Sequence, residues 1–99
     1  MSESPAYVYL LKCSDSSLYC GWTFDIPDRL SMHRSGKGSK YVRSRLPVSL
    51  VYCESRHSKS DALRREAAIK HLSRKEKIML LDSVDNLVGT VFDKDGVRL

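Results

Sequence analysis

Two short segments rich in tyrosine and branched side chains constrain the fold of this chain more than any other feature. Residues 6–12 (AYVYLLK) and 18–23 (LYCGWT) both have the composition of β-strands, and the polar run 14–17 (SDSS) separates them. This arrangement predicts a β-hairpin, although no Asn-Gly pair fixes the type of turn.

The length of the hairpin loop decides which side chains share a face, because strand side chains alternate with a period of two. If Cys13 pairs with Leu18, Tyr9 and Tyr19 point to opposite faces. If Cys13 pairs with Tyr19 across a five-residue loop, the two tyrosines share a face. The second register leaves an almost wholly apolar set on the other face: Val8, Leu10, Leu18, Cys20 and Trp22. Burial favours this segregation, so we expect an odd loop or an equivalent bulge.

A helix is predicted directly after the hairpin. Asp25 can accept the free amide hydrogens of its first turn, and Pro27 fits that turn. The helix should end near Gly36. Arg29 and His33 are four residues apart and therefore share a face of this helix.

The middle of the chain is predicted to contain a loop and a third strand. Residues 36–47 have the composition of a basic loop, and residues 48–55 that of a strand. Regular alternation would place Val48, Leu50 and Tyr52 on one side of this strand.

Two helices and a weakly patterned end complete the chain. Ser58 and Ser73 are each followed three residues later by an acidic residue, which predicts helices running to about Leu72 and Leu81. We therefore expect one domain over residues 1–82. Residues 83–99 form an extension that could fold as a small hairpin.

Composition and charge exclude several classes of protein. The apolar fraction of 41% is ordinary for a globular protein, and no apolar run approaches the roughly 20 residues of a membrane span. The first five residues lack the basic and apolar regions of a secretory signal, so a cytoplasmic location and no membrane partner are expected. The three cysteines have no metal-binding spacing and are interpreted as buried, inert thiols.

The net charge of +5 favours a polyanionic partner, and part of that charge is concentrated in one segment. Five cations without an intervening acid surround Tyr41: Arg34, Lys37, Lys40, Arg43 and Arg45. Two interpretations stay open. Either the segment is a solvated loop, or its cations contact nucleic-acid phosphates while Tyr41 stacks on a base. A P-loop is excluded because the glycine spacing is wrong and the segment follows a helix.

Glu66 falls on the apolar side of its predicted helix, between Ala62 and Ile69 on a helical wheel. A carboxylate in such a position needs a partner, because an unpaired buried charge is strongly unfavourable. That partner is either an arginine, such as Arg29 or Arg65, or a divalent cation.

The ordered set of these residues resembles the GIY-YIG nuclease superfamily, specifically its small stand-alone bacterial members of the UPF0213 group. Tyr7-Val8-Tyr9 stands where the family has Gly-Ile-Tyr, and Tyr19-Cys20-Gly21 where it has Tyr-Ile-Gly. Three further segments are similar to family motifs: residues 28–33 (DRLSMH), 35–41 (SGKGSKY) and 62–67 (ALRREA). The resemblance covers about three-quarters of the chain.

The resemblance implies an α+β fold, with a three-stranded antiparallel β-sheet flanked by helices. It also implies a single Mg²⁺ or Mn²⁺ ion held by Glu66. Tyr9 would help to activate the attacking water, with Tyr19 in support. Arg29 would contact the scissile phosphate, and His33 would orient or deprotonate a neighbouring phenol. Taken one at a time, Tyr9 and Tyr19 fit structural roles better and Arg29 and His33 fit solvated helix positions better, so the functional interpretation depends on the whole set.

Three hypotheses for function follow. The first is a metal-dependent endonuclease that acts on DNA rather than RNA, including branched or damaged DNA. The second is a nucleic-acid-binding module of the same fold with weak or no cleavage. The third is an adaptor that binds a partner protein. A domain this small could use a targeting partner or a homodimer, and the late asparagine of several catalytic families is not identified, so Asn86 is left unassigned.

Overall fold

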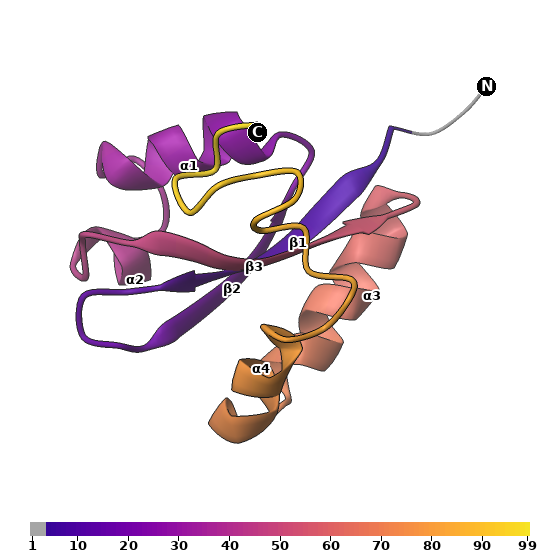
Figure 1. Cartoon of the computed structure of the whole chain (residues 1–99). Coiled ribbons are helices and arrows are strands. Elements are labelled where there is room, and N and C mark those ends of the chain that lie inside the picture. The colour runs from indigo at the N-terminus through magenta and orange to yellow at the C-terminus, as the bar shows by residue number, and fades with distance from the viewer. Residues whose placement is uncertain (1–3) are drawn as a thin grey trace.

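The computed structural model describes residues 4–99, which form a three-stranded antiparallel sheet with four helices (Figure 1). In chain order the elements are β1 (Ala6–Lys12), β2 (Leu18–Thr23), α1 (Ile26–Arg34), α2 (Lys40–Arg43), β3 (Ser49–Arg56), α3 (Lys59–Lys70) and α4 (Arg74–Leu80). The strand order is β2-β1-β3. The predicted α+β architecture is confirmed. Within residues 4–99, no helix combines the length and apolar character needed to cross a membrane.

The hairpin of β1 and β2 has a tighter turn than either predicted register. Tyr9 lies opposite Gly21, and Leu11 lies opposite Tyr19. The Cys13 amide donates to the Ser17 carbonyl, so only three residues form the loop. The last of these, Ser16, adopts a positive φ of 68°, which is the expected geometry of a three-residue hairpin loop. The predicted loop length was wrong. Because a three-residue loop is also odd, Tyr9 and Tyr19 still share a face, as predicted.

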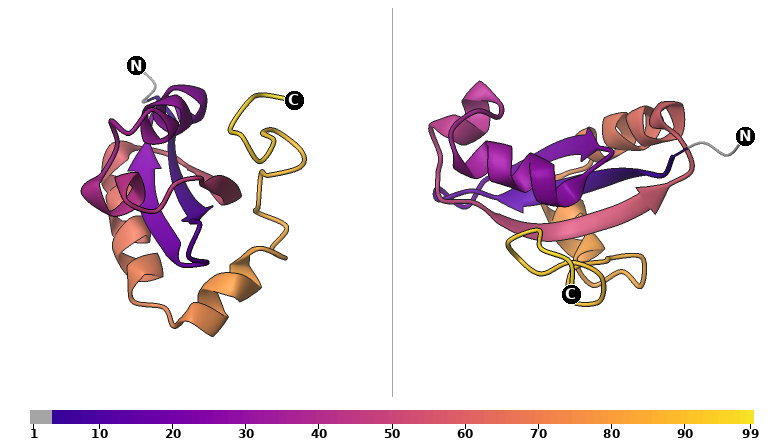
Figure 2. Two further views of the ribbon diagram at one scale, coloured as in Figure 1. Left: turned by 90° about the vertical axis from the view of Figure 1, so that its left-hand side faces the viewer. Right: turned by 90° about the horizontal axis from the view of Figure 1, so that it is seen from above.

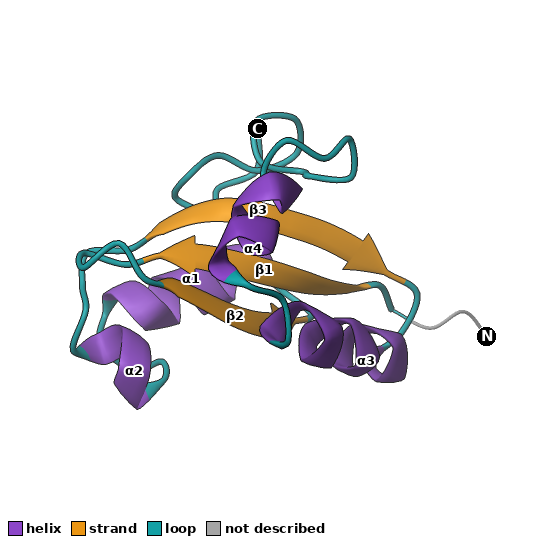
Figure 3. Ribbon diagram, turned by 90° about the horizontal axis from the view of Figure 1, so that it is seen from below, coloured by secondary structure: helices purple, strands orange, loops and turns teal. Residues whose placement is uncertain are grey.

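The sheet separates two clusters of buried side chains. On one face, Tyr9 and Leu11 pack with Ile26 and Leu30 of α1. On the other face, Val8, Leu10, Cys20 and Tyr52 of the strands pack with Ala62 and Ile69 of α3. Figure 3 shows α3 and α4 on one side of the sheet and α1 behind it. The sequence-predicted segregation of the hairpin is therefore what places the two tyrosine motifs beneath α1.

A bulge in β3 contradicts the predicted alternation of that strand. Leu10 pairs with Tyr52 and Leu11 with Leu50, so Val51 is an extra residue between them. Leu50 therefore joins the α1 cluster, whereas Tyr52 joins the α3 cluster. One inserted residue shifts every later side chain to the opposite face.

Polar caps fix where the helices begin. The side chains of Asp25 and Ser58 accept backbone hydrogen bonds at the starts of α1 and α3, and Ser73 and Glu76 form a reciprocal capping box at α4. These starts confirm the prediction. The segment predicted as a loop is not wholly irregular, because Ser39 caps the one-turn helix α2.

Residues 83–99 run beside β3 as an irregular chain (Figure 2). The Leu87 amide donates to Cys53, and the Leu50 amide donates to the Lys94 carbonyl. Phe92 is fully buried in the α1 cluster and forms an antiparallel bridge with Arg98. The amides of Asp93 and Leu99 donate to the carbonyls of Val97 and Val91, so the suggested hairpin is present in minimal form. This extension supplies both core and edge protection to the sheet.

The Asn86 side chain forms hydrogen bonds with backbone groups of β3 at and next to the bulge. Its carbonyl oxygen accepts from the amides of Cys53 and Val88, and its nitrogen donates to the carbonyls of Val51 and Leu81. One side chain thus binds two backbone groups of β3, the Val51 carbonyl and the Cys53 amide, and two groups of the chain around it. This is a structural role for the asparagine.

We expect Asn86→Ala to lower the free energy of unfolding by about 2 kcal/mol, because these hydrogen bonds are lost together and the backbone groups of β3 lose their partners. Urea unfolding measures the change. Hydrogen exchange should also become faster at the Cys53 and Val88 amides. Asp85→Ala, the neighbouring exposed position, is the matched control. Equal stability of the two variants would contradict this role of Asn86.

Candidate active site

Tyr9, His33 and Arg29 meet beneath α1. The Tyr9 hydroxyl lies 2.9 Å from Nε2 of His33, and Nε of Arg29 donates to the same hydroxyl at 3.4 Å. Tyr9 comes from the central strand, and the four-residue spacing on α1 directs both other side chains toward it. Tyr9 and His33 are fully buried, whereas Arg29 is partly exposed.

Two glycines leave the room that these side chains occupy. A Cβ atom on Gly21 would lie 2.6 Å from the Tyr9 hydroxyl, and one on Gly38 would lie 2.2 Å from Nδ1 of His33. Gly21 is opposite Tyr9 in the sheet, so its missing side chain lets the phenol lie across β2. Gly38 lets the segment before α2 close over the imidazole.

Burial keeps both members of the Tyr9–His33 pair neutral near pH 7. It raises the pKa of Tyr9 to about 12, although the hydrogen bond from Arg29 acts in the opposite direction. Burial, together with the Arg29 charge, lowers the pKa of His33 to about 4. Since Arg29 donates to Tyr9, the pattern assigns the phenol proton to the bond with Nε2 and places the imidazole proton on Nδ1. Within residues 4–99, Nδ1 is the one buried side-chain nitrogen or oxygen without a hydrogen-bond partner.

The lowered pKa of His33 predicts a loss of stability in mild acid. In the unfolded chain His33 binds a proton near pH 6.5, whereas in the folded protein it binds one only near pH 4. The free energy of unfolding should therefore fall as the pH drops through this window, by up to about 3 kcal/mol. Urea unfolding across this range measures it. In His33→Asn the free energy of unfolding should depend less on pH, whereas exposed His71→Gln should keep the wild-type dependence. An unchanged pH dependence in His33→Asn would contradict the lowered pKa of His33.

An aromatic stack extends this cluster toward the surface. The Tyr19 ring packs against both Tyr9 and His33, with ring centroids 6.5 and 5.5 Å apart, and stacks beside Tyr41 at 6.0 Å. The guanidinium of Arg45 covers one face of the Tyr41 ring at 3.7 Å. Tyr19 is partly exposed and Tyr41 is exposed. The structure thus brings Tyr9, Tyr19, Arg29 and His33 together, but the predicted convergence is incomplete, because Glu66 lies on α3 and α3 packs on the other face of the sheet.

Some side chains of the basic segment are exposed to solvent, and one is bound to partners within the protein. Lys37, Lys40 and Arg43 are exposed and can reach an external phosphate. Arg45 instead donates to Asp15 and to the Tyr41 carbonyl, both at 3.0 Å. The predicted contact of Arg45 with nucleic acid therefore competes with internal partners.

Glu66 lies on α3, which covers the opposite face of the sheet from α1. Its side chain is 16% exposed, and Lys70 is 3.7 Å from the carboxylate. Its backbone carbonyl lies 4.0 Å from the thiol of Cys20, on the edge strand β2. Neither predicted arginine partner pairs with it, since Arg65 binds another acid and Arg29 contacts Tyr9.

The donor set around Glu66 is limited but compatible with a magnesium-type ion. Among residues 4–99, no three His, Cys, Asp or Glu side chains converge in a metal-binding arrangement. Mg²⁺ commonly takes one or two carboxylates and completes its shell with water and substrate phosphate. Glu66 offers one partly exposed carboxylate, whose ion-pair partner Lys70 is itself exposed. A single-carboxylate site fits the residues present.

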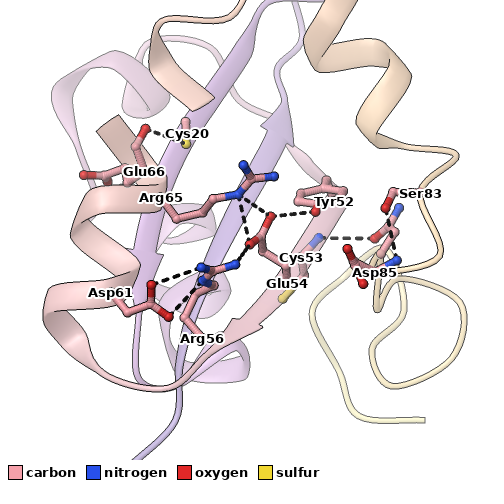
Figure 4. A network of polar contacts seen from close by, with 11 residues as sticks. Cys20, Tyr52, Cys53, Glu54, Arg56, Asp61, Arg65, Glu66, Ser83 and Asp85 are labelled. Atoms are coloured by element: carbon pink, nitrogen blue, oxygen red, sulfur yellow. Dashed lines mark hydrogen bonds and ion pairs between the residues drawn. The ribbon is translucent and has the colours of Figure 1, made fainter. Parts of the chain in front are cut away.

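The most deeply buried acid in the described part of the chain is Glu54, which the sequence did not single out. Arg65 donates from Nε to both carboxylate oxygens at 3.0 and 3.1 Å, and Tyr52 and Arg56 bind the same group at 2.6 and 3.0 Å. Asp61 holds the other side of Arg56. Figure 4 shows this network between β3 and α3. It is enclosed by its partners and serves the sheet–helix contact.

Comparison with known families accounts for the two tyrosine motifs and the helix that follows them. The GIY-YIG catalytic domain matches residues 5–79. The chain belongs to the GIY-YIG family. This family assignment makes it a nuclease-type domain, with a general expectation of nucleic-acid interaction and divalent metal.

Relatives place this GIY-YIG protein among the UPF0213 proteins. It is 46% identical over 86 residues to a UPF0213 protein of Streptococcus agalactiae, covering 87% of this chain and 98% of the relative. It is 54% identical over 79 residues to one of Syntrophus aciditrophicus, covering 79% and 91%. The solution NMR structure of a UPF0213 protein from Bacillus halodurans is 44% identical, with a TM-score of 0.53 over 82% of this chain and 86% of that one.

Proposed function

We propose that this GIY-YIG protein is a metal-dependent endonuclease that hydrolyses phosphodiester bonds in DNA, with branched or damaged DNA as candidate substrates. The observation that carries the proposal is the Tyr9 hydroxyl shared between Nε2 of His33 and Nε of Arg29. A phenol bound to a neutral imidazole can pass its proton on. A planar guanidinium beside it matches phosphate oxygens.

The partly exposed side chains make the first contact with substrate. Arg29 binds the scissile phosphate, and partly exposed Tyr19 lies in the aromatic stack between buried Tyr9 and exposed Tyr41. The hydrogen bond from Arg29 to Tyr9 is long, at 3.4 Å, and therefore weak. A phosphate can replace Tyr9 as the partner of this guanidinium at little cost in free energy. As Arg29 moves onto phosphate, the Tyr9 hydroxyl becomes accessible to the attacking water.

Proton transfer then runs from Tyr9 to His33. With a pKa raised to about 12, Tyr9 does not work as a free phenolate near pH 7. It can accept a proton from water while donating its own to Nε2 of His33, so that no isolated phenolate forms. The buried imidazole is neutral near pH 7 and has a nitrogen that can accept this proton, while its pKa of about 4 makes it a weaker base than a free histidine.

Glu66 is the residue that would hold Mg²⁺ or Mn²⁺. When bound, such an ion offsets charge on the phosphate and acidifies water. The exposed cations Lys37, Lys40 and Arg43 would contact the nucleic-acid backbone beyond the scissile position.

A nucleic-acid-binding domain with little cleavage is the second candidate. It is favoured by the complete burial of Tyr9 and by the position of Glu66 on the other face of the sheet. Under this alternative, the Tyr9–His33 pair only stabilises the core under α1, and the basic segment carries the function.

A cleavage panel decides between the two. Single-stranded, duplex, flap and junction DNA are incubated with Mg²⁺, with Mn²⁺ and with chelator, and binding is measured in parallel without metal. We expect metal-dependent nicking that disappears in Glu66→Gln and Arg29→Ala, while DNA affinity persists in Glu66→Gln. Asp82→Asn, at an exposed acid, serves as the matched control.

The contradicting results are equally specific. If the wild type binds DNA and nicks none of the substrates with either metal, the binding-domain candidate replaces the nuclease. If affinity is negligible and does not increase as salt is lowered, phosphate binding itself fails.

A further inference from the structure

An exposed phenylalanine stands beside Arg29 with a cleft on either side. Phe24 connects β2 to α1 and is 50% exposed. One cleft, of about 380 Å³, is lined by Trp22, Thr23, Phe24, Asp25, Asp28 and Arg29. The other, of about 510 Å³, is lined by Ser4, Pro5, Tyr7, Phe24, Asp25 and Arg98. Each cleft therefore combines the Phe24 ring with one arginine.

The Phe24 ring is held in place although it is exposed. Trp22 packs edge-on against it, with ring centroids 5.2 Å apart and an interplanar angle of 88°. Thr23 and Asp25 fix the backbone on either side, because the Thr23 hydroxyl donates to the Asp25 carbonyl and accepts from its amide. Such an anchored ring can bind a ligand without being ordered first.

The smaller cleft also links the two sides of the sheet. Trp22 packs with the α3 cluster, and Nζ of Lys59 on α3 lies 5.6 Å from its ring, whereas Arg29 belongs to α1. A nucleotide whose phosphate is bound by Arg29 would have its base directed into this space. The cleft is thus continuous with the proposed phosphate position.

Charge in the cleft separates the phosphate from the base. Asp25 and Asp28 lie at the start of α1, and the Asp25 carboxylate accepts the Asp28 amide. These acids disfavour phosphate inside the cleft and leave it to Arg29, while the uncharged face of a base meets no such repulsion. An aromatic ring beside a cation is the combination that single-stranded nucleic acids use for binding.

We propose that Phe24 is a stacking platform for one unpaired nucleobase next to the phosphate bound by Arg29. The inference rests on the proposed function and specifies its substrate class: a nucleic acid with an exposed base, such as a single strand, flap or junction. A base inside a continuous duplex has both faces covered by its neighbours and cannot stack on a fixed external ring. Phe24 is therefore a specificity residue and takes no part in bond cleavage.

Stacking is tested by binding alone, in chelator, so that the result does not depend on cleavage. The probe is a short single-stranded oligonucleotide with one 2-aminopurine, whose fluorescence falls when the base stacks on an aromatic ring. Wild type and Phe24→Trp should quench the probe. Phe24→Ala and Phe24→Leu should lose the quenching and bind the single strand about tenfold more weakly, with duplex affinity unchanged. Met79→Ala, which truncates an exposed apolar side chain on α4, is the matched control.

Three results would overturn the inference. In the first, Phe24→Ala binds and quenches the probe as the wild type does. In the second, Phe24→Leu keeps the full affinity and quenching of the wild type. In the third, the wild type does not bind the probe. The first two leave metal-dependent cleavage intact, so they would reject the stacking platform without rejecting the nuclease. Conversely, loss of quenching in Phe24→Ala in a protein that cleaves nothing supports the platform within the binding-domain candidate.

Discussion

Tyr9→Phe is expected to lower the rate of DNA cleavage by about 10²–10⁴-fold, the range that a general base contributes. The substitution removes one oxygen, and with it the bonds to His33 and Arg29. The ring itself remains, so its packing against Tyr19 and Leu11 is preserved. Single-turnover cleavage of the best substrate from the panel, at saturating protein, measures the chemical step.

Tyr19→Phe is the matched control for a phenol in the same stack, and a smaller loss of rate is expected there because Tyr19 has only a supporting role. Far-ultraviolet circular dichroism and urea unfolding should show Tyr9→Phe folded, with a loss of about 1 kcal/mol for the missing hydrogen bonds. A cleavage rate within threefold of the wild type would show Tyr9 to be a core tyrosine, and the proton relay through His33 would fail.

The hairpin faces and the helix starts could be predicted because each depends on a local pattern. Apolar alternation separates the two faces of β1 and β2, and polar residues before α1, α3 and α4 cap their first turns. The turn length could not be predicted, since Ser16 adopts a positive φ without being glycine or asparagine. The bulge at Val51 was hidden by a regular-looking strand, and the side chain that binds its carbonyl, Asn86, is 35 residues away in the sequence.

The candidate site was predictable to the extent that its residues lie on elements with fixed periodicity. Arg29 and His33 are one helical turn apart, and an odd loop puts Tyr9 and Tyr19 on one face, so their convergence follows once α1 covers that face. The burial of Tyr9 and the internal partners of Arg45 depend on tertiary packing that spacing does not reveal.

The sequence around Glu54 contains a charge pattern that indicates this network. Tyr52, Glu54 and Arg56 alternate along β3 and so share a face, and Asp61 and Arg65 lie four residues apart on α3. Complementary charges at these two periods predict a strand–helix network. Glu66 drew attention instead because its helical position is close to the apolar stripe.

Glu54→Ala is expected to lower the free energy of unfolding by about 3 kcal/mol, and the melting temperature by about 15 °C. Glu54 is 4% exposed, and its removal leaves Arg65 and the Tyr52 hydroxyl without their acceptor. Arg56 loses less because Asp61 still binds it. The side chains of Arg56 and Arg65 are about one-third exposed, so water partly compensates and the loss stays at the lower end for a broken buried pair.

The charge argument is separated from simple truncation by a double substitution. Glu54→Met with Arg65→Met removes both charges and keeps comparable volume, so it should recover much of the stability lost in Glu54→Ala. Asp82→Ala, at an exposed acid, should change the free energy of unfolding by less than about 0.5 kcal/mol. If the double variant is as unstable as Glu54→Ala, the loss does not come from an unpaired arginine but from the missing acceptor for the Tyr52 hydroxyl and for Arg56.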